Sequence, residues 1–347
     1  MKKTFTTLLA VLLMISSILT KTDIKAETET KVPTYKTYTF IGDSIAAGHS
    51  LADYNSYADG HEKSIYQEEY NTSSYGDGHL IKESYAQLVY DAVKAENVNC
   101  LAMSGFSTAS LRYMLDDSYE MDETTTKFLS WATEERYTTD GYEAFREPYK
   151  EAIKNSDLIT IGVGSNDYLY GFIAAFSRIS TLISQNSEMP TETFGQRVSK
   201  KFSQLASLFK VIKYVLDSLD ETYDKLTENW DTTIELIRKL NPDAKIVVVG
   251  LYNPMRDMTL SKDSKIKVGK LANSTIKKVN KFFEKKAKTR NEYTYVDVGD
   301  VEVYECFTVQ EAASFDSNFF KKLANVIHPT PAGHKYIADK IIAALAQ

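Results

Sequence analysis

Short apolar runs alternate with longer amphipathic stretches along most of the chain. Five runs, each followed by Gly, Asn or Asp, have the composition of buried strands; they span residues 38–41, 98–103, 158–163, 245–251 and 293–298. The intervals between these runs are long enough for crossover helices, so the strands are expected to pair in parallel. The pattern therefore predicts a three-layer α/β/α sandwich around a mainly parallel five-stranded sheet.

Three further segments complete this pattern. Residues 332–346 carry apolar positions on one side and predict a final helix. Residues 54–78 are polar and rich in Tyr, Ser, Asn and Gly, which is typical of a long loop. Residues 168–230 are predicted to be helical, and their apolar stripe fits either packing on the core or a cap over a site; the stripe comprises Phe202, Leu205, Phe209, Ile212, Leu216 and Leu219. We expect a single domain at 37–347, in which residues 54–78 and 168–230 are insertions.

The N-terminal residues have the features of a secretory signal. A cationic start, Met-Lys-Lys, precedes an apolar run from Phe5 to Thr20, and small and polar residues follow up to Ala26. The run is shorter than the roughly 20 residues that a membrane-spanning helix needs, and Thr and Ser interrupt it. The sequence therefore predicts a cleaved signal peptide at 1–26, a linker at 27–36, and a secreted protein without stable membrane insertion.

Charge and cysteine content narrow the function classes. The chain has 41 Lys and Arg against 47 Asp and Glu, a formal charge of -6, which disfavours a nucleic-acid partner because such proteins need a dense cationic face. Two cysteines, Cys100 and Cys306, are too few for a disulfide framework. Both lie beside predicted strands, which favours two buried thiols, although spacing alone does not exclude a bridge between them.

Candidate chemistry lies where the predicted strands end, which is where parallel α/β sheets bind ligands. Gly-Asp-Ser at 42–44 predicts a tight turn that exposes Ser44 at a helix N-terminus. After the second strand, Gly105 allows close backbone approach to a ligand, and after the third, Asn166 supplies an amide donor. His328 lies in a loop before the final helix. Each residue alone also fits an ordinary cap, turn or packing role.

Taken together and in this order, the four blocks resemble the SGNH, or GDSL, hydrolase family, which has a flavodoxin-like fold. The family's GDS turn, glycine after the second strand, GxND block and DxxH block correspond to GDSIAAG at 42–48, NCLAMSG at 99–105, GSND at 164–167 and NVIHPTPAGH at 325–334. The resemblance extends from about residue 38 to 345, apart from the two insertions. It implies a secreted serine esterase or lipase that hydrolyses carboxylic esters of lipids or acylated carbohydrates.

The resemblance also implies a role for each matching residue. Ser44 would attack the ester carbonyl to form an acyl-enzyme, and His328 would act as the general base that a serine hydroxyl requires. The N–H groups of Ser44 and Gly105 and the side-chain amide of Asn166 would form the oxyanion hole. No metal or cofactor is expected, because the nucleophile is a side chain and the oxyanion donors are neutral.

One position departs from the family pattern, because Asn325 stands where the family has an aspartate three residues before the histidine. An asparagine can accept a hydrogen bond from the imidazole but lacks the charge that stabilises imidazolium. Three interpretations are open: a Ser-His pair oriented by Asn325 or by a backbone carbonyl, an aspartate from elsewhere, or a weakened enzyme. Two other functions also stay open, namely a noncatalytic ester- or glycan-binding module and an acyltransferase that uses the same nucleophile.

Several neighbouring residues are expected to have lesser roles. His334 is expected to be structural, in the first turn of the final helix. His49 is expected at a solvent-facing position, and Asp43 at the start of a helix where the dipole stabilises its charge. Asp167 and two tyrosines, Tyr168 and Tyr170, are candidates for the lining of a substrate pocket.

Overall fold

The computed structural model describes residues 31–49, 51–52, 80–121, 139–169, 219–259, 262–263, 265, 267–304, 306, 308 and 326–347. Within these ranges, five strands form one sheet in the order β2-β1-β3-β4-β5, and every neighbouring pair is parallel. The strands are β1 (Thr37–Gly42), β2 (Asn97–Ala102), β3 (Leu158–Gly162), β4 (Lys245–Val249) and β5 (Thr294–Val296). Each coincides with a predicted apolar run, so the parallel five-stranded sheet is confirmed.

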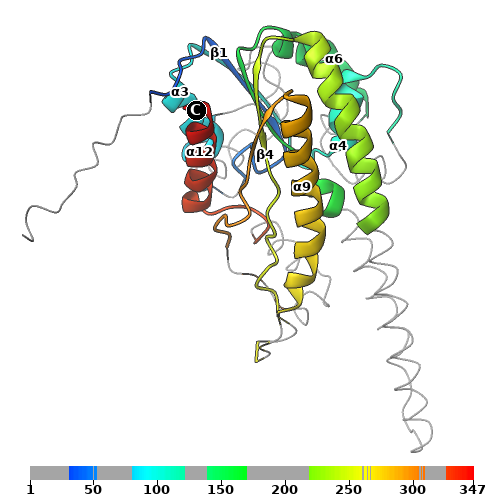
Figure 1. Ribbon diagram of the computed structural model, residues 1–347, viewed down its shortest axis with the longest axis vertical. Coiled ribbons are helices and arrows are strands. Elements are labelled where there is room, and N and C mark those ends of the chain that lie inside the picture. Colours follow the sequence, from blue (N-terminus) through cyan, green and yellow to red (C-terminus); the bar gives the residue numbers. More distant parts are fainter. Residues whose placement is uncertain are drawn as a thin grey trace, which may run out of the picture.

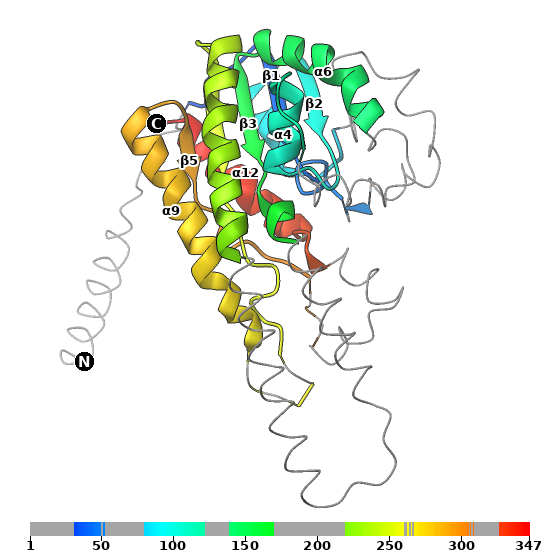
Figure 2. The same ribbon diagram turned by 90° about the vertical axis from the view of Figure 1, so that its right-hand side faces the viewer.

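Helices cover both faces of the sheet (Figure 1). The helices are α3 (Tyr85–Val93), α4 (Thr108–Leu115), α6 (Thr139–Lys154), α9 (Asn273–Arg290) and α12 (Pro331–Leu345), with a 3-10 helix, η2, at Val268–Ala272. Residues 219–240 are also helical. Helices α3 and α12 lie on one side, while α4, α6 and α9 lie on the other, which faces the viewer in Figure 2. The predicted three-layer sandwich and its final helix are confirmed.

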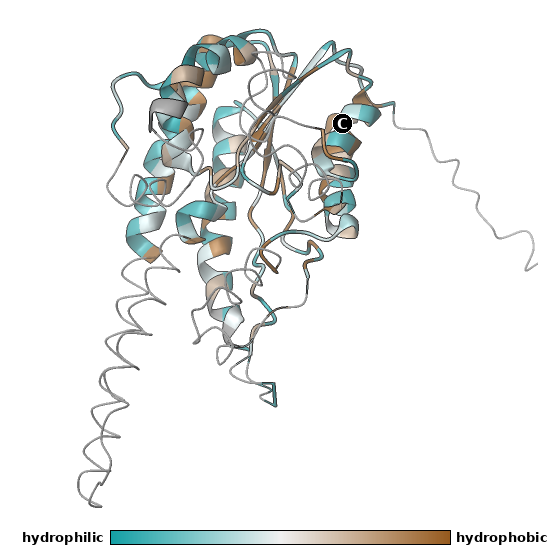
Figure 3. Cartoon of the chain, turned by 180° about the vertical axis from the view of Figure 1, so that it is seen from behind, coloured by the Kyte–Doolittle hydropathy of each residue, from teal (hydrophilic) through white to brown (hydrophobic). Residues whose placement is uncertain are grey.

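The alternation of side chains along each strand divides the core into two layers. Phe40 and Val247 pack in the cluster that includes α3 and α12. Their neighbours Ile41 and Val248 point the other way, into the cluster that includes α4, α6, α9 and residues 219–240. Figure 3 shows the apolar strands at the centre and hydrophilic residues on the outer sides of the helices. The strands are apolar on both faces because helices bury both faces.

Capping residues determine where the two helices α3 and α12 begin. The Ser84 hydroxyl accepts from the Gln87 N–H at 3.1 Å and starts α3. The Thr330 hydroxyl accepts from the Gly333 N–H at 3.1 Å, and Pro331 occupies the first turn of α12. The loop that carries His328 therefore ends at Thr330, the capping residue two positions after His328.

His334 links α12 to α3, as its predicted place in the first turn of the last helix allows. Its Nδ1 accepts from the backbone N–H of Tyr85 at 3.2 Å, and the side chain is fully buried. Burial lowers the pKa of this imidazole to about 3, so the ring is neutral at physiological pH. The hydrogen bond therefore joins two helices that pack on the same face of the sheet.

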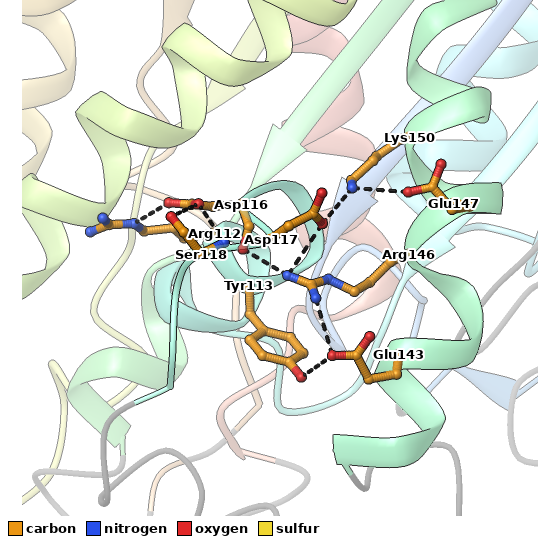
Figure 4. Close-up of polar contacts among 9 residues, drawn as sticks. All are labelled: Arg112, Tyr113, Asp116, Asp117, Ser118, Glu143, Arg146, Glu147 and Lys150. Atoms are coloured by element: carbon orange, nitrogen blue, oxygen red, sulfur yellow. Dashed lines mark hydrogen bonds and ion pairs between the residues drawn. The ribbon is translucent and has the colours of Figure 1, made fainter.

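A network of charged residues joins α6 to the end of α4 (Figure 4). Arg146 of α6 donates to the Asp116 carbonyl at 2.7 Å, and its guanidinium lies 4.4 Å from the centre of the Tyr113 ring. Lys150 donates to Asp117 at 2.7 Å, and Glu143 accepts from both Tyr113 and Arg146. Both cations are mostly buried, and each is paired with a carboxylate. The network therefore holds α4 against α6.

Several predicted segments lie outside the described residues. These are the signal peptide at 1–26, the loop at 54–78, and residues 170–218 of the long insertion with most of its apolar stripe. The described parts of that insertion, 168–169 and 219–230, are helical as predicted. Among the helices that the structure describes, none combines the length and the apolar character that crossing a membrane requires.

The two cysteines are thiols and form no disulfide with each other. Cys100 is buried in β2, and this burial raises the pKa of its thiol. Cys306 is only partly buried. The expectation of two buried thiols is therefore right for Cys100 and wrong for Cys306, which follows β5 and is itself in neither a helix nor a strand.

Candidate active site

The blocks predicted to carry the chemistry meet at the carboxyl ends of three adjacent strands. Strand β1 lies between β2 and β3, so the turns that follow these strands are neighbours. The Oγ atom of Ser44 lies 2.8 Å from Nε2 of His328, a hydrogen-bond distance between residues 284 positions apart. Both side chains are largely buried, with 9% of Ser44 and 2% of His328 exposed. The fold thus brings the predicted serine and histidine into contact.

The segment after β1 differs from the prediction, because residue 43 is a bend and residues 44–49 form consecutive turns and no regular helix. Its backbone hydrogen bonds do not follow the regular spacing of an α-helix. The Ala47 N–H donates to the Asp43 carbonyl at 3.0 Å, the Gly48 N–H to the Ile45 carbonyl at 3.2 Å, and the His49 N–H to the Ser44 carbonyl at 2.9 Å. Gly48 has a φ of 77°, which bends the chain out of a helical path. The expected helix N-terminus at Ser44 is therefore wrong.

The side chain of Asn166 connects the turns that follow β1, β2 and β3. Its Nδ2 donates to the Phe106 carbonyl at 3.0 Å and to Oδ2 of Asp43 at 3.4 Å. The side chain is buried, with 5% exposed. The amide predicted from the GSND block therefore lies at the centre of the site and is held by the residue that precedes Ser44.

Asp43 is a buried carboxyl whose role the sequence revealed only in part. Oδ1 accepts from the Ile45 N–H at 2.9 Å, as expected for a residue that starts a turn, while Oδ2 faces Asn166. Burial raises the pKa of Asp43 from 3.8 to about 7, and the nearby carboxylate of Asp167 adds to this effect, while the Ile45 N–H opposes it. The surrounding protein, rather than a helix dipole, therefore governs the charge of Asp43.

Gly105 lies in the turn after β2 with a φ of 79°, a conformation that favours glycine. The pairing of β1 with β2 continues into this turn, because the Met103 N–H donates to the Gly42 carbonyl at 2.9 Å. The next residue, Phe106, supplies the carbonyl that Asn166 binds. Gly105, the predicted backbone donor, therefore directly precedes the residue whose carbonyl Asn166 binds.

Contacts from the ends of β4 and β5 anchor the loop that carries His328. The Tyr252 hydroxyl donates to the Ile327 carbonyl at 2.6 Å. Val303 forms an antiparallel bridge with Pro329, and the Thr330 N–H donates to the Glu302 carbonyl at 3.1 Å. No sequence signal marked Tyr252, because its role depends on a partner 75 residues away. Asn325, the predicted orienting residue, lies outside the described residues.

One neighbouring residue differs from its expected position, and another makes a contact that the sequence did not indicate. His49 is half-buried rather than solvent-facing, and its ring stacks on that of His328 with 4.5 Å between ring centres and 24° between planes. Asp167 accepts from the N–H of Thr108 at 3.0 Å, so it anchors the first residue of α4. Tyr168 packs against the core, and Tyr170 lies outside the described residues.

A small cavity of about 20 Å³ lies beside the turn of Ser44. Ile45 and Ser165, the neighbours of Ser44 and Asn166, form part of its lining with Tyr252 and Tyr85. The Tyr85 hydroxyl is buried and has no hydrogen-bond partner within the described part of the chain. The volume is sufficient for about one water molecule, so this cavity is too small for a long acyl chain.

The sequence matches the family model for the GDSL-like lipase/acylhydrolases over residues 38–341. The chain therefore belongs to this family and is an enzyme that hydrolyses ester bonds, as the resemblance of its four blocks implied. A comparison with curated protein sequences gave no match.

Solved structures with a similar chain path include several lipases and esterases. An extracellular lipase from Streptomyces rimosus is 14% identical, with a TM-score of 0.48 and coverage of 89% of this chain and 99% of its own. Phospholipase A1 from Streptomyces albidoflavus is 15% identical, with a TM-score of 0.43 and coverage of 90% and 98%. A family two carbohydrate esterase from Clostridium thermocellum, in complex with cellohexaose, is 13% identical, with a TM-score of 0.37 and coverage of 90% and 63%.

Proposed function

We propose that the protein is a serine esterase in which Ser44 is the nucleophile and His328 the general base. The observation that carries this proposal is the 2.8 Å hydrogen bond between Oγ of Ser44 and Nε2 of His328. A serine hydroxyl is a weak nucleophile at neutral pH, and an adjacent imidazole removes its proton as it attacks. This pair is therefore the arrangement that ester hydrolysis through an acyl-enzyme requires.

The reaction would proceed in two halves. In the first, Oγ of Ser44 bonds to the ester carbonyl carbon, its proton moves to Nε2 of His328, and the imidazolium then protonates the departing alcohol. In the second half, His328 takes a proton from water, the resulting hydroxide attacks the acyl carbon, and the proton returns to Oγ of Ser44 as the acid leaves.

The oxyanion of each tetrahedral intermediate would lie among the N–H groups of Ser44 and Gly105 and the amide of Asn166. Two observations support this arrangement. No acceptor for the N–H of Ser44 occurs among the residues that the structure describes. The amide hydrogen of Asn166 that faces Asp43 makes a long contact of 3.4 Å, so a charged oxyanion can compete for it.

The base function of His328 also requires an N–H at Nδ1, because Nε2 must accept the proton of Ser44. We assign the orienting contact at Nδ1 to Asn325 or to a backbone carbonyl. A carboxylate at this position stabilises imidazolium at least as well as an amide does, so Asn325→Asp is expected to leave the hydrolysis rate equal or higher. A large loss of activity would show that the amide itself is used.

For the natural substrate we propose a carboxylic ester of a lipid or an acylated carbohydrate, with preference for lipid or short-chain esters. The apolar stripe of the long insertion, at residues 202–219, supports an acyl group as the bound portion. We further propose that the protein is secreted after removal of residues 1–26 and that residues 37–347 form a single domain. The mass of the protein recovered from the growth medium tests the cleavage site.

Labelling with a fluorophosphonate, followed by mass mapping of the adduct, tests the nucleophile without knowledge of the substrate. The adduct is expected on Ser44 and is expected to be lost in Ser44→Ala. The exposed Ser118 provides the matched control, because its hydroxyl donates to the Asp116 carboxylate at 2.6 Å rather than to a histidine; Ser118→Ala removes the same group and should label like the natural protein. Absence of labelling where a reference serine hydrolase reacts would contradict the assignment of Ser44 as the nucleophile.

Two further measurements separate the remaining alternatives. Release of p-nitrophenol from esters of increasing acyl length ranks short against long chains. Product analysis in the presence of an added alcohol distinguishes hydrolysis from acyl transfer, since both pass through the same acyl-enzyme. An ester of the added alcohol as the main product would identify a transferase.

A further inference from the structure

The ring of His49 covers one face of the His328 imidazole. The ring centres lie 4.5 Å apart and the ring planes differ by 24°, which is a stacked arrangement. The edge of the same imidazole is hydrogen bonded through Nε2 to Oγ of Ser44. His328 is thus contacted at its edge by the nucleophile and on its face by His49.

The turn that follows Ser44 places His49 at this position. Its backbone N–H donates to the Ser44 carbonyl at 2.9 Å, and the preceding Gly48 has a φ of 77°. Gly48 also lies close against the residues just before α3, where an added Cβ would come within 2.9 Å of Ile81 and 3.1 Å of Ser84. One short segment therefore determines the positions of both the serine and the ring that covers the histidine.

An aromatic face at this distance has two effects on the proton transfer. It restricts rotation of the His328 ring, and a misplacement of about 1 Å in a catalytic group costs roughly 100-fold in rate. While the His49 ring is neutral, it also attracts positive charge, because the π face of an aromatic ring interacts with a cation within about 6 Å of the ring centre. His328 is 2% exposed, so water offers little solvation to the imidazolium that forms there.

We propose that His49 is a positioning residue for His328: its ring holds the imidazole against Ser44 and stabilises the positive charge that the imidazole acquires. This inference rests on the proposed function, because it assumes that His328 accepts the proton of Ser44. The turn after β1 then carries the nucleophile, Ser44, and also positions the general base, His328, through His49.

Three substitutions at His49 test the proposal. His49→Ala removes the ring, His49→Leu keeps apolar bulk without a π face, and His49→Phe keeps the aromatic face. In hydrolysis of p-nitrophenyl acetate, we expect Ala and Leu to lower kcat by roughly 10-fold with little change in KM, and Phe to remain within about 3-fold of the natural protein. The labelling rate of Ser44 by the fluorophosphonate should fall in the same order, because labelling needs the base but not ester binding.

Each other outcome identifies a different role for His49. Equal rates for the Leu and Phe variants would overturn the inference, since apolar packing alone would then suffice. An effect confined to KM would also overturn it and would make His49 a substrate contact. If the Ala variant unfolds, the comparison of the Leu and Phe variants decides the question.

The failure of this inference is distinguishable from that of the proposed function. Ser44→Ala and His328→Ala, measured in the same assay, should abolish turnover and labelling. Retention of activity in these two variants would refute the proposed function itself. Their inactivity, together with an unchanged rate in His49→Ala, would refute only the role of His49.

Discussion

The buried carboxyl of Asp43 should make the stability of the protein fall as the pH rises. Burial raises the pKa of this group from an ordinary value of 3.8 to about 7 in the folded protein. Below about pH 4 both the folded and the unfolded chain hold the proton, so ionisation costs nothing. Between about pH 4 and 7 the unfolded chain ionises first, and stability is lost until the folded group ionises as well.

The size of this effect follows from the separation of the two pKa values. A difference of about three units corresponds to roughly 4 kcal/mol in total, of which more than half is lost between pH 5 and pH 8. Asp43→Asn removes the ionisable group and keeps an oxygen that can accept from the Ile45 N–H. The free energy of unfolding of the variant should therefore decline by roughly 3 kcal/mol less than that of the natural protein over this range.

Urea unfolding monitored by tryptophan fluorescence at pH 5, 6, 7 and 8 measures how the free energy of unfolding changes with pH in the natural protein and in Asp43→Asn. The exposed Asp300 offers a matched control, because Asp300→Asn makes the same chemical change at the surface and should keep the pH dependence of the natural protein. Parallel pH profiles for Asp43→Asn and the natural protein would refute the reasoning, because burial of Asp43 would then carry no proton linkage.

The same substitution is expected to slow the enzyme. With its oxygen toward the Ile45 N–H, the new amide presents N–H groups to the Nδ2 atom of Asn166, which is itself a donor. The two amides cannot pair in that orientation, so the Asn166 amide should turn away from its place near Ser44. We expect kcat for p-nitrophenyl acetate to fall at least about 10-fold while stability at pH 8 rises. An unchanged kcat would show that Asp43 does not position Asn166.

Three further substitutions test the site and the core. Asn166→Ala should lower kcat for p-nitrophenyl acetate by about 100-fold or more, and an unchanged rate would remove Asn166 from the oxyanion site. Gly48→Ala should cost about 1–3 kcal/mol in urea unfolding, because Gly48 has a φ of 77° and a Cβ would lie 2.9 Å from Ile81; an equal unfolding midpoint would contradict this. Trp230→Ala should cost about 3–5 kcal/mol, since the ring is 1% exposed and lies 4.4 Å from that of Phe283; a loss below about 1 kcal/mol would contradict the packing.

Much of the fold was determined by local features of the sequence. Apolar runs such as 158–163 and 245–251 are readable because strand and helix periodicities are properties of neighbouring residues. The intervals between the runs predicted parallel pairing, and the structure has it in all four strand pairs. The order of the blocks around Ser44 and His328 also indicated the family, because block order is a property of the sequence alone.

Only the tertiary structure decided how the site is held together. The link from Asn166 to Asp43 and Phe106, the anchor from Tyr252, and the stacking of His49 all join residues that local patterns treat separately. The turns at 44–49 replace the expected helix for the same reason. Packing of Ala46 and Ala47 in the cluster that includes α3, with the bond from the Asp43 N–H to the Gly162 carbonyl of β3, outweighs the helix propensity of these small residues. Contacts between distant parts of a chain depend on the shape of the whole fold, and a local pattern carries no information about that shape.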